Sequence, residues 1–439
     1  MMKKEGLVKL KEKLLTYNAK ELLERDLYLR DLAGGKLEGP LTGYASIDKP
    51  WLKYYKTMDI MSGIPYKVSA LQLIKEKNYE HKNRVAIKYF GNMFTYKEMF
   101  LKIDEFASRF KELGVKCGDI VSIAMPTTPE TVFSFYALNK IGAICDMIDP
   151  RSNGEQMKYY LNENKSKLLI LCENYYKNMK NALDEIDIKT ILLPITVSAS
   201  LGVKLLVDSK VKLDNLKLGY SKNIMKWQEF MKLDKDRVTY QEYNDKDLAL
   251  IVHSSGTTSV PKGIMITNRN INSIAISYSK TSLNLNIGDR FLSVIPAFAS
   301  FGMITSINLP FYLTMENYLI PQATPDNFVK SVEKFKPNFC LTIPANFINL
   351  MKKSKLEDYS FFYGPGCGGY SLDSSKEEEI NNYLLARNAP VPMLMGWGMS
   401  ELSSTACLEV PECSKLLSSG IPLIKNTISI FEPGTDNEL

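Results

Sequence analysis

Short segments that are apolar at almost every position alternate with helix-patterned segments along most of this chain, and this alternation limits the possible folds more than any other feature. Segments 120–125 and 168–172 are such apolar runs, and a helical pattern at 130–140 follows the first of them. Strands that are apolar on both faces are typical of parallel sheets covered by helices on both sides. The sequence therefore predicts an α/β fold with mostly parallel sheets.

The alternation occurs twice. It stops in a polar, weakly patterned stretch at about 196–246 and then resumes, which indicates two α/β lobes joined by a connection. In the second lobe, strands are predicted near residues 248–253, 289–295, 338–343 and 359–363, and helices near 268–280, 325–335, 344–353 and 372–386.

The residues before the first lobe are expected to form a helical leader and an arm, because leucines recur at helical spacing near the N-terminus. The first helix with clear ends follows them. Thr95 and Glu98 form a capping box at its start, and Gly114 suits the position just after its end.

Charge and cysteine usage narrow the class of protein. The net charge is +6, from 55 basic and 49 acidic residues, and the two signs are interleaved without forming a basic stripe. A nucleic-acid-binding surface needs such a stripe, so no nucleic-acid partner is expected. The seven cysteines include no Cys-x-x-Cys pair and several lie in apolar runs, which favours buried thiols in a reducing compartment such as the cytoplasm. With only His81 and His253 present, a histidine-rich metal site is excluded.

The uncharged stretch 291–315 is long enough to cross a bilayer. It contains Pro296, Pro310 and several hydroxyl side chains, and it begins like a strand. A buried strand–loop–helix unit is therefore predicted there, and no transmembrane span is expected.

A loop rich in glycine and hydroxyl side chains follows the apolar strand 248–252. Its notable positions are Ser254, Ser255, Gly256, Thr257, Thr258, Ser259 and Lys262. Small residues let backbone N–H groups approach phosphate oxygens, and a lysine adds positive charge. The spacing is not that of a Walker A loop. By composition alone, a flexible surface turn is the simpler interpretation.

A second motif follows the apolar segment 391–395. It consists of Gly396, Trp397, Gly398, Met399, Ser400 and Glu401. An aromatic ring between glycines can stack on a base, and a nearby carboxylate can hold Mg²⁺ that bridges phosphates. The alternative is a loop with a buried tryptophan and a surface glutamate. About thirty residues earlier lies a third, glycine-rich segment, 363–372, which taken alone is a turn between a strand and a helix.

These three elements, in this order and at these separations, resemble the signatures of the adenylate-forming superfamily, which includes acyl-CoA synthetases, peptide-synthetase adenylation domains and luciferases. The family's loop is roughly Ser/Thr-Ser-Gly-Thr-Thr-Gly-x-Pro-Lys-Gly, and this chain differs from it at Ser259. Trp397 and Ser400 stand where the family has tyrosine and threonine. The resemblance covers the chain from about Trp51 onward.

The resemblance implies that ATP activates a carboxylic acid as an acyl-adenylate, and it assigns roles to the matching residues. Thr257, Thr258 and Lys262 would hold the pyrophosphate part of ATP, with the rest of the loop from Ser254 binding nucleotide. The backbone of Gly368, Gly369 and Tyr370 would frame adenine, and Trp397 would pack against it. Ser400 would contact the α-phosphate and Glu401 would bind Mg²⁺. Thr258, Lys262 and Glu401 would be the catalytic residues.

The family builds its acyl pocket partly from the segment after the loop. The corresponding residues here are Phe298, Ala299, Phe301, Gly302 and Met303. At the position of Ala299 many acyl-CoA synthetases have histidine, and amino-acid-selecting domains often have aspartate. A buried ammonium without a counter-charge is costly, so a neutral, apolar carboxylic acid is favoured over an α-amino acid. The same apolar side chains could also be plain core.

The resemblance also divides the chain. The predicted regions are a helical leader and arm at 1–75, a first lobe with its connection at 76–245, a second lobe with the AMP-binding motifs at 246–415, and the start of a small β-barrel at 416–439. In the family a C-terminal lid follows, with a lysine that orients the carboxylate. No match to that lid is found before Leu439, so the chain as given is expected to bind ATP weakly and to adenylate poorly.

Three functions remain open from the sequence. The first is an acid–AMP ligase that passes the acyl group to CoA. The second is an adenylation domain that loads the thiol of a carrier protein. The third is a non-catalytic module that binds a nucleotide or an acyl group.

Overall fold

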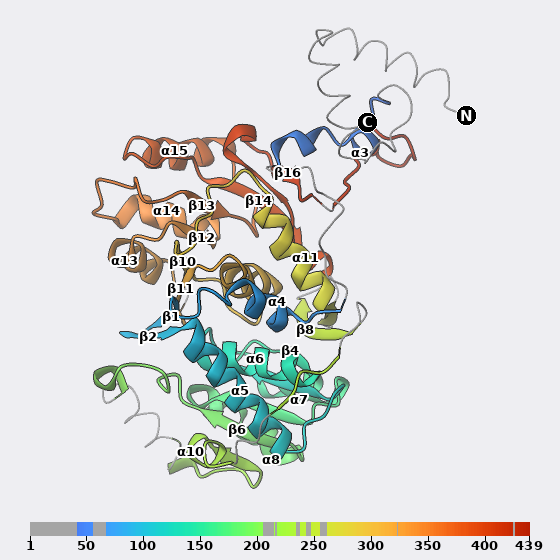
Figure 1. The fold of residues 1–439 in the computed structure, drawn as a ribbon, viewed down its shortest axis with the longest axis vertical. Coiled ribbons are helices and arrows are strands. Elements are labelled where there is room, and N and C mark those ends of the chain that lie inside the picture. Colours follow the sequence, from blue (N-terminus) through green and yellow to red (C-terminus); the bar gives the residue numbers. More distant parts are fainter. Residues whose placement is uncertain are drawn as a thin grey trace.

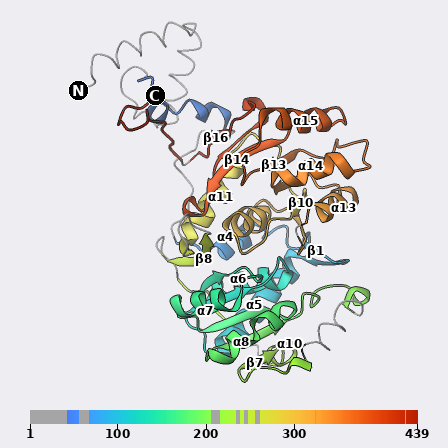
Figure 2. The ribbon, with the colours of Figure 1, turned by 180° about the vertical axis from the view of Figure 1, so that it is seen from behind.

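The computed structural model describes residues 42–55, 67–204, 215, 217–233, 238–242, 247–254, 261–322, 324–424 and 426–439. In this part of the chain, two β-sheets lie one above the other along the long axis of the molecule, with helices between them and on their outer sides (Figures 1 and 2). The two predicted α/β lobes are confirmed, but the strand predicted at 248–253 as part of the second lobe belongs to the sheet of the first, because it pairs with the strand at 144–147. The exact domain boundaries stay a prediction.

The first sheet, the lower one in Figure 1, has seven strands among the described residues. Their order is β7 (Ile224–Lys226), β6 (Lys189–Leu193), β5 (Leu168–Cys172), β3 (Ile120–Ala124), β4 (Ile144–Met147), β8 (Leu248–Ser254) and β9 (Lys262–Thr267). Neighbouring strands are parallel except for β8 and β9, which form an antiparallel hairpin. The polar connection contributes β7, which its pattern did not predict.

The second sheet has nine strands in the same described ranges. Their order is β16 (Ile421–Pro422), β15 (Ser404–Leu408), β14 (Leu394–Met399), β13 (Gly364–Cys367), β12 (Phe339–Thr342), β10 (Arg290–Ser293), β11 (Glu316–Leu319), β1 (Val85–Tyr89) and β2 (Asn92–Thr95). The strands from β14 to β1 are parallel, and antiparallel strands close both edges. Thus β1 and β2 come before every strand of the first sheet in sequence, yet they complete the second.

Helices cover both sheets. They are α3 (Ala45–Asp48), α4 (Ala70–Lys77), α5 (Tyr96–Glu112), α6 (Pro129–Ile141), α7 (Gly154–Glu163), α8 (Tyr176–Glu185), α10 (Trp227–Phe230), α11 (Asn268–Ser279), α12 (Leu309–Tyr312), α13 (Pro325–Phe335), α14 (Pro344–Lys353) and α15 (Ser374–Leu385). The capping box predicted for α5 is confirmed, because the Thr95 side chain accepts from the Glu98 N–H and the Glu98 side chain accepts in return. Gly114 follows the helix with φ of 81°, as a C-terminal glycine should.

The apolar strands are buried on both faces, as the sequence indicated. In β5, Leu168, Ile170 and Cys172 pack in the core that includes α5 and α6. Leu169 and Leu171 point the other way and pack in a second cluster with α7 and α8. Successive side chains of a strand point to opposite faces, so one apolar run serves two helix layers.

The strand predicted near 359–363 is wrong, because the strand is β13, in the segment interpreted as a glycine-rich turn. Glycine is needed there for packing: a Cβ on Gly364 would lie 2.1 Å from the Phe339 ring, and one on Gly366 2.5 Å from Leu341. Pro365 is tolerated because pairing with β14 begins only after it, at Gly366.

The uncharged stretch 291–315 forms the buried unit that the sequence predicted. It contains most of β10, a loop, the π-helix η3 (Phe301–Asn308) and α12. No helix in the described part of the chain is long and apolar enough to cross a membrane.

The two ends of the described chain pack against each other. Trp51 and Leu52 share a small apolar cluster with Val410 and Ile421, and the Tyr55 hydroxyl donates to the Pro422 carbonyl over 2.6 Å. Within 416–439 the structure has the two-residue strand β16 and one bridge between Phe431 and Glu438, and the start of a β-barrel there stays a prediction. The described residues form no closed barrel.

Two buried asparagines join three helices between the sheets. Asn139 of α6 donates to the Asn268 side-chain oxygen of α11 over 2.7 Å. The same oxygen accepts from the Ala70 N–H, and the Asn139 oxygen accepts from the Leu71 N–H. The first N–H groups of a helix have no partner within it, so these asparagines complete the start of α4.

A buried carboxyl group begins α6. Glu130 is 1% exposed, and its Oε1 accepts from the Ser198 hydroxyl. Its Oε2 has no partner among the described residues. Burial raises the pKa of Glu130 from 4.5 to about 7, and the Ser198 hydrogen bond opposes this only in part.

Glu130 should therefore make stability fall with pH. The folded state holds the proton more tightly than the unfolded chain, so the contribution is fully present below about pH 4.5 and is lost as pH rises through about 7. Glu130→Gln removes this pH dependence. From about pH 5 to about pH 8, the unfolding free energy of Glu130→Gln minus that of the unmodified protein should therefore rise by about 1–3 kcal/mol. Urea unfolding at both pH values measures this, with exposed Glu357→Gln as the control. Equal pH dependence of Glu130→Gln and the original chain would contradict the assignment.

Candidate functional site

A cavity of about 200 Å³ lies at the carboxyl ends of three adjacent parallel strands, β12, β13 and β14. It is lined by Tyr278, Ala299, Ser300, Phe301, Leu341, Cys367, Gly368, Gly369, Gly396, Trp397, Gly398, Met399, Ser400, Ser404, Thr405 and Leu408. The carboxyl ends of parallel strands are the usual place for ligand sites in α/β proteins. The Gly396–Glu401 motif and the glycine-rich segment 363–372 thus meet at this cavity with two residues of the predicted acyl pocket, Ala299 and Phe301.

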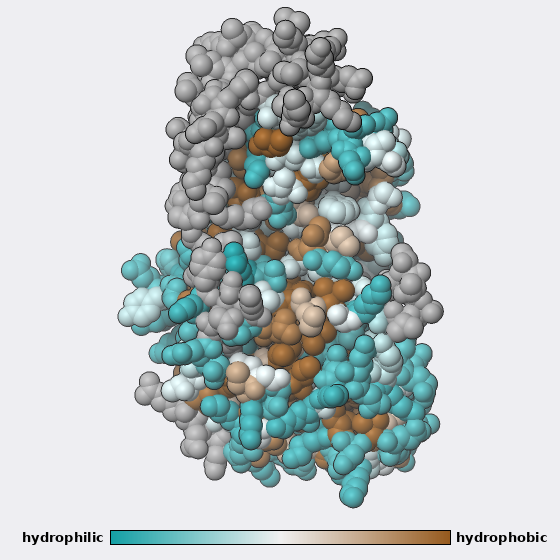
Figure 3. All heavy atoms as spheres, turned by 90° about the vertical axis from the view of Figure 1, so that its right-hand side faces the viewer, coloured by the Kyte–Doolittle hydropathy of each residue, from teal (hydrophilic) through white to brown (hydrophobic). Residues whose placement is uncertain are grey.

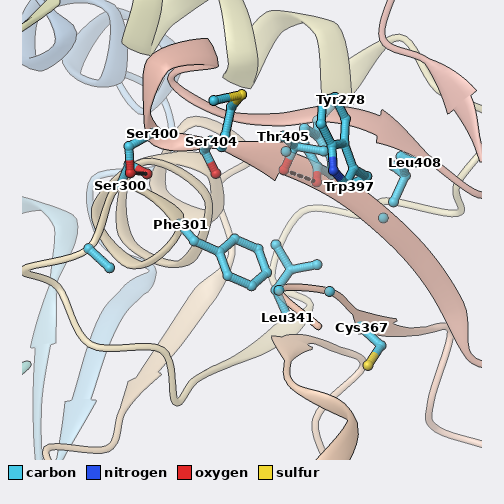
Figure 4. Close-up of a pocket in the computed structure, with 16 residues that line it drawn as sticks. Tyr278, Ser300, Phe301, Leu341, Cys367, Trp397, Ser400, Ser404, Thr405 and Leu408 are labelled. Atoms are coloured by element: carbon cyan, nitrogen blue, oxygen red, sulfur yellow. Dashed lines mark hydrogen bonds between the residues drawn. The ribbon is translucent and has the colours of Figure 1, made fainter. Parts of the chain in front are cut away.

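Hydrogen bonds connect the elements around the cavity. The hydroxyl oxygens of Ser300 and Ser400 lie 3.0 Å apart, so the turn before η3 is joined to the end of β14. The Tyr278 hydroxyl of α11 donates to the Thr405 oxygen of β15 over 3.0 Å. Figure 4 shows Phe301 between the serine pair on one side and Leu341 and Cys367 on the other. Tyr278 and Thr405 lie apart from this serine pair, beside Trp397 and Leu408, so polar groups occur at two places and Phe301, Leu341 and Cys367 form an apolar wall.

Burial sets the protonation of two groups in the wall. It raises the pKa of Tyr278 to about 12, so this hydroxyl stays protonated and can donate. It also raises the pKa of the Cys367 thiol well above its usual range. A thiol is a nucleophile only as its thiolate, so Cys367 is a small apolar wall residue.

The two strands of the β14–β15 hairpin lie very close to each other at Gly398. A Cβ on Gly398 would lie 1.7 Å from the Ser404 carbonyl oxygen, and one on Gly368 would lie 2.8 Å from the Gly396 carbonyl. Ser403 and Ser404 adopt positive φ angles of 61° and 111°, which is uncommon for residues other than glycine. Such strain often occurs at ligand-binding sites, where the surrounding structure holds it in place.

Only two of the predicted acyl-pocket residues line the cavity, Ala299 and Phe301. Met303 is 1% exposed in the core, and Gly302 lies so close to the Pro296 backbone that no side chain fits there. Phe298 packs at the edge of the core, with the Arg151 guanidinium 5.4 Å from its ring centre. The role of these three residues in an acyl pocket stays a prediction.

The predicted phosphate loop is the connection of the β8–β9 hairpin. Ser254 ends β8, Lys262 begins β9, and the two are paired in register. Ser255, Gly256, Thr257, Thr258 and Ser259 lie outside the described residues. The hairpin lies on the side of the molecule that carries α11, and Figure 3 shows apolar side chains gathered near mid-height of this side.

The second motif lies next to this hairpin. The turn η4 (Ser400–Leu402) contacts β9, so Lys262 and Glu401 come from segments that are far apart in sequence and adjacent in space. Both side chains are exposed. Trp397 is 46% exposed and Tyr370 is 71% exposed. Among the residues that the structure describes, no three His, Cys, Asp or Glu side chains form a metal-binding group.

A network of side-chain hydrogen bonds holds β8, the strand before the predicted phosphate loop, and the sequence did not predict it. The His253 Nε2 lies 2.6 Å from Asp146 Oδ1, and the Ser122 hydroxyl donates to Asp146 Oδ2 over 2.6 Å. The His253 ring lies 4.1 Å from that of Tyr160, between ring centres. The serine bonds the carboxylate rather than the imidazole, so this is no nucleophilic triad. It fixes β8 against β4 and β3, and the only sequence signal was an aspartate within an apolar strand.

The sequence matches a known family over most of its length. Residues 74–439 match the model of the AMP-binding enzyme family, so the chain belongs to that family. The long-chain-fatty-acid–CoA ligase of Bacillus subtilis strain 168 is 24% identical over an alignment of 366 residues, which covers 81% of this chain and 64% of that protein. A crotonobetaine/carnitine–CoA ligase of Escherichia coli O45:K1 is 26% identical over 74% of this chain and 59% of that protein. The chain thus spans about 60% of the length of these curated relatives.

Solved structures share the fold. An anthranilate CoA ligase in complex with anthranoyl-AMP superposes with a TM-score of 0.70 at 18% identity, over 82% of this chain and 65% of that one. A long-chain-fatty-acid-CoA ligase from Archaeoglobus fulgidus gives 0.71 at 19% identity, over 85% and 73%. The predicted membership in the adenylate-forming superfamily is confirmed.

The close approach of Gly398 to β15 predicts the effect of adding one methyl group. Gly398→Ala should destabilise the protein by about 2 kcal/mol or more, because the Ser404 backbone cannot move without breaking the hairpin. Thermal unfolding measures this. Met399→Ala, in the same strand with an exposed side chain, should change stability by less than about 0.5 kcal/mol. Equal stability of the two variants would show that the hairpin adapts.

Proposed function

We propose that this chain binds ATP and a carboxylic acid at the cavity between β12, β13, β14 and η3, and that the protein joins the acid to AMP and then to CoA. The observation that carries this proposal is the meeting of the Gly396–Glu401 motif, the glycine-rich strand end at Gly368 and the β8–β9 hairpin at one edge of the second sheet. Membership in the AMP-binding enzyme family supports it.

The nucleotide would lie across the exposed end of this cavity. Trp397 has nearly half of its surface free, which leaves a ring face for adenine, and the backbone of Gly368 and Gly369 has no side chain in the way. Ser400 would donate to the α-phosphate. Its hydroxyl is already oriented by Ser300, which supports a role in positioning.

The loop between Ser254 and Lys262 would hold the remaining phosphates. The register of β8 and β9 and the hydrogen bond of His253 to Asp146 fix both ends of this loop. Lys262 is exposed at the start of β9, where its charge can act on a polyphosphate. We assign Thr257 and Thr258 to the same task from the family pattern.

Glu401 fits the role of a magnesium ligand. Mg²⁺ in nucleotide sites is commonly held by one or two carboxylates together with the phosphates, so a single exposed carboxylate next to the loop is a sufficient protein contribution. When bound, the ion would neutralise phosphate charge as the acid oxygen attacks the α-phosphate and pyrophosphate leaves.

The acid would enter the apolar half of the cavity. Phe301, Leu341 and Cys367 form this half, and none of the described side chains that line the cavity is charged. An α-amino acid would leave its ammonium group without a counter-charge there. A neutral, apolar acid of modest size is the substrate class that this wall favours, and CoA ligases among the relatives support CoA as the acceptor.

Acid-dependent exchange of labelled pyrophosphate into ATP tests the adenylation step. With the full-length gene product and a panel of apolar acids, exchange should occur and should fall about tenfold or more in Lys262→Ala and in Glu401→Gln. Exposed Glu357→Gln is the matched control and should leave the rate unchanged.

The outcomes separate the alternatives. No exchange with any acid, together with retained ATP binding, would favour a non-catalytic nucleotide-binding module. Exchange followed by acyl transfer to a carrier-protein thiol rather than to CoA would favour an adenylation domain that serves such a carrier.

A further inference from the structure

A second, larger cavity lies away from the candidate site, and none of the described residues lines both. Its volume is about 700 Å³, within the range of roughly 300–1,000 Å³ typical of small-molecule sites. It is lined by Lys88, Tyr89, Phe90, Gly91, Asn92, Met93, Ser200, Val203, Tyr318, Leu319, Ile320, Pro321, Gln322, Asn327, Lys330, Ser331, Lys334 and Phe335. Figure 1 shows β1, β11 and α13 on the opposite side of the molecule from α11, and Figure 2 shows β1 and α13 there again.

Aromatic and aliphatic side chains form much of the wall. Tyr318 and Phe335 pack with their ring centres 4.8 Å apart. Phe90 and Met93 also line the cavity and are 41% and 59% exposed, although both are large and apolar. An apolar ligand placed here would remove these surfaces from water, which is favourable in proportion to the area buried.

The helix α13 turns a basic face toward this cavity. Asn327, Lys330, Ser331, Lys334 and Phe335 line it and follow the spacing of one helical face, while the buried Phe328 and Val332 pack in the core. The two lysines are exposed. No acidic side chain is among the described residues that line the cavity.

The acids of the same helix bind elsewhere. Asp326 pairs with Lys353 over 2.7 Å, and Glu333 accepts from the Lys355 N–H over 2.7 Å. Both partners belong to the region at the end of α14. The pKa of Asp326 is lowered mainly by its hydrogen bond to Lys353 and in smaller part by the charge of Lys330, so Lys330 is partly balanced within the helix. Neither Lys330 nor Lys334 forms a salt bridge with an acid of α13 in the described part of the chain.

Lys88, the third lysine among the described residues that line the cavity, is held in a fixed position. The Lys88 ammonium lies 3.1 Å from Glu316 and donates to the Tyr318 hydroxyl over 3.0 Å. Burial acts to lower the pKa of Lys88, but the hydrogen bonds to Tyr318 and Glu316 outweigh it and raise the pKa. Lys88 thus stays charged, with Glu316 as its counter-ion.

The turn between β1 and β2 forms a braced wall. Phe90 and Gly91 have φ angles of 42° and 80°, and a positive φ is a genuine outlier for a residue as bulky as phenylalanine. The Phe90 carbonyl accepts from the Ser200 N–H over 3.1 Å, which holds the turn against the segment that carries Ser200 and Val203. A strained residue that its surroundings hold in place is often found at ligand sites.

We propose that this cavity is a second binding site, which takes a small amphiphilic anion with its negative group at Lys330 and Lys334 and its apolar body against Phe335. The site is separate from the proposed adenylation site, so the two can be tested independently. Two exposed cations over an apolar wall complement an anionic head on an apolar tail, and they disfavour a neutral or cationic amphiphile.

Isothermal titration of the whole chain with octyl phosphate tests this site, because an alkyl phosphate is not a carboxylic acid that adenylation could use. Octyl phosphate should bind once per chain. Octanol, inorganic phosphate and octyltrimethylammonium should each bind at least about tenfold more weakly, which corresponds to ~1.4 kcal/mol. The four ligands separate the contribution of the charge from that of the tail.

Charge reversal locates the site. Lys330→Glu with Lys334→Glu should weaken octyl phosphate binding about tenfold or more, since exposed side chains are changed and folding is spared. Lys352→Glu with Lys355→Glu makes the same change in net charge on neighbouring exposed lysines outside the cavity, and should have less than about a twofold effect. Equal loss in both double variants, equal binding of octanol, or unchanged binding in the first double variant would overturn the proposal.

Discussion

The hydrogen bonds around Asn139 and Asn268 connect the two halves of the molecule, and the geometry of the candidate site depends on them. They join α6, which packs on the first sheet, to α11 and to the start of α4. Both side chains are almost fully buried, so removing one partner would leave the other unsatisfied at a cost of about 1–3 kcal/mol. A polar contact of this kind has one correct geometry, which apolar packing alone does not impose.

The helix α11, which these hydrogen bonds position, also contributes to the wall of the cavity. The helix begins at Asn268 and carries Tyr278 near its other end, where the hydroxyl bonds Thr405 of β15. It follows β9 directly and packs against η3. One rigid helix therefore relates the predicted phosphate loop, the turn that holds Ser300 and the hairpin that holds Trp397. The end of β8, the start of β9 and the cavity of the second sheet are held in a fixed relation because the same helix layer contacts both sheets.

Local patterns predicted elements well where one physical rule dominated. The capping box at Thr95 and the apolar run at 168–172 led to α5 and β5 with nearly correct ends. Local patterns did not predict β13, because its glycines and proline favour a turn. Those glycines are required by the Phe339 and Leu341 side chains of the neighbouring strand, and such a contact cannot be read from the strand itself. The bond between His253 and Asp146 was missed for the same reason, since it crosses from β8 to β4.

The sequence by itself determined the α/β class, the two lobes and the family, because strand and helix periodicity and the loop motifs are local properties of the chain. Only the tertiary structure decided that β1 and β2 complete the second sheet, that Ser300 meets Ser400, and that Ala299 and Phe301 line the cavity while Met303 is core. It also decided that the basic face of α13 borders a second cavity. These facts depend on the order of strands in the sheets, and that order is set by contacts between residues far apart in the chain.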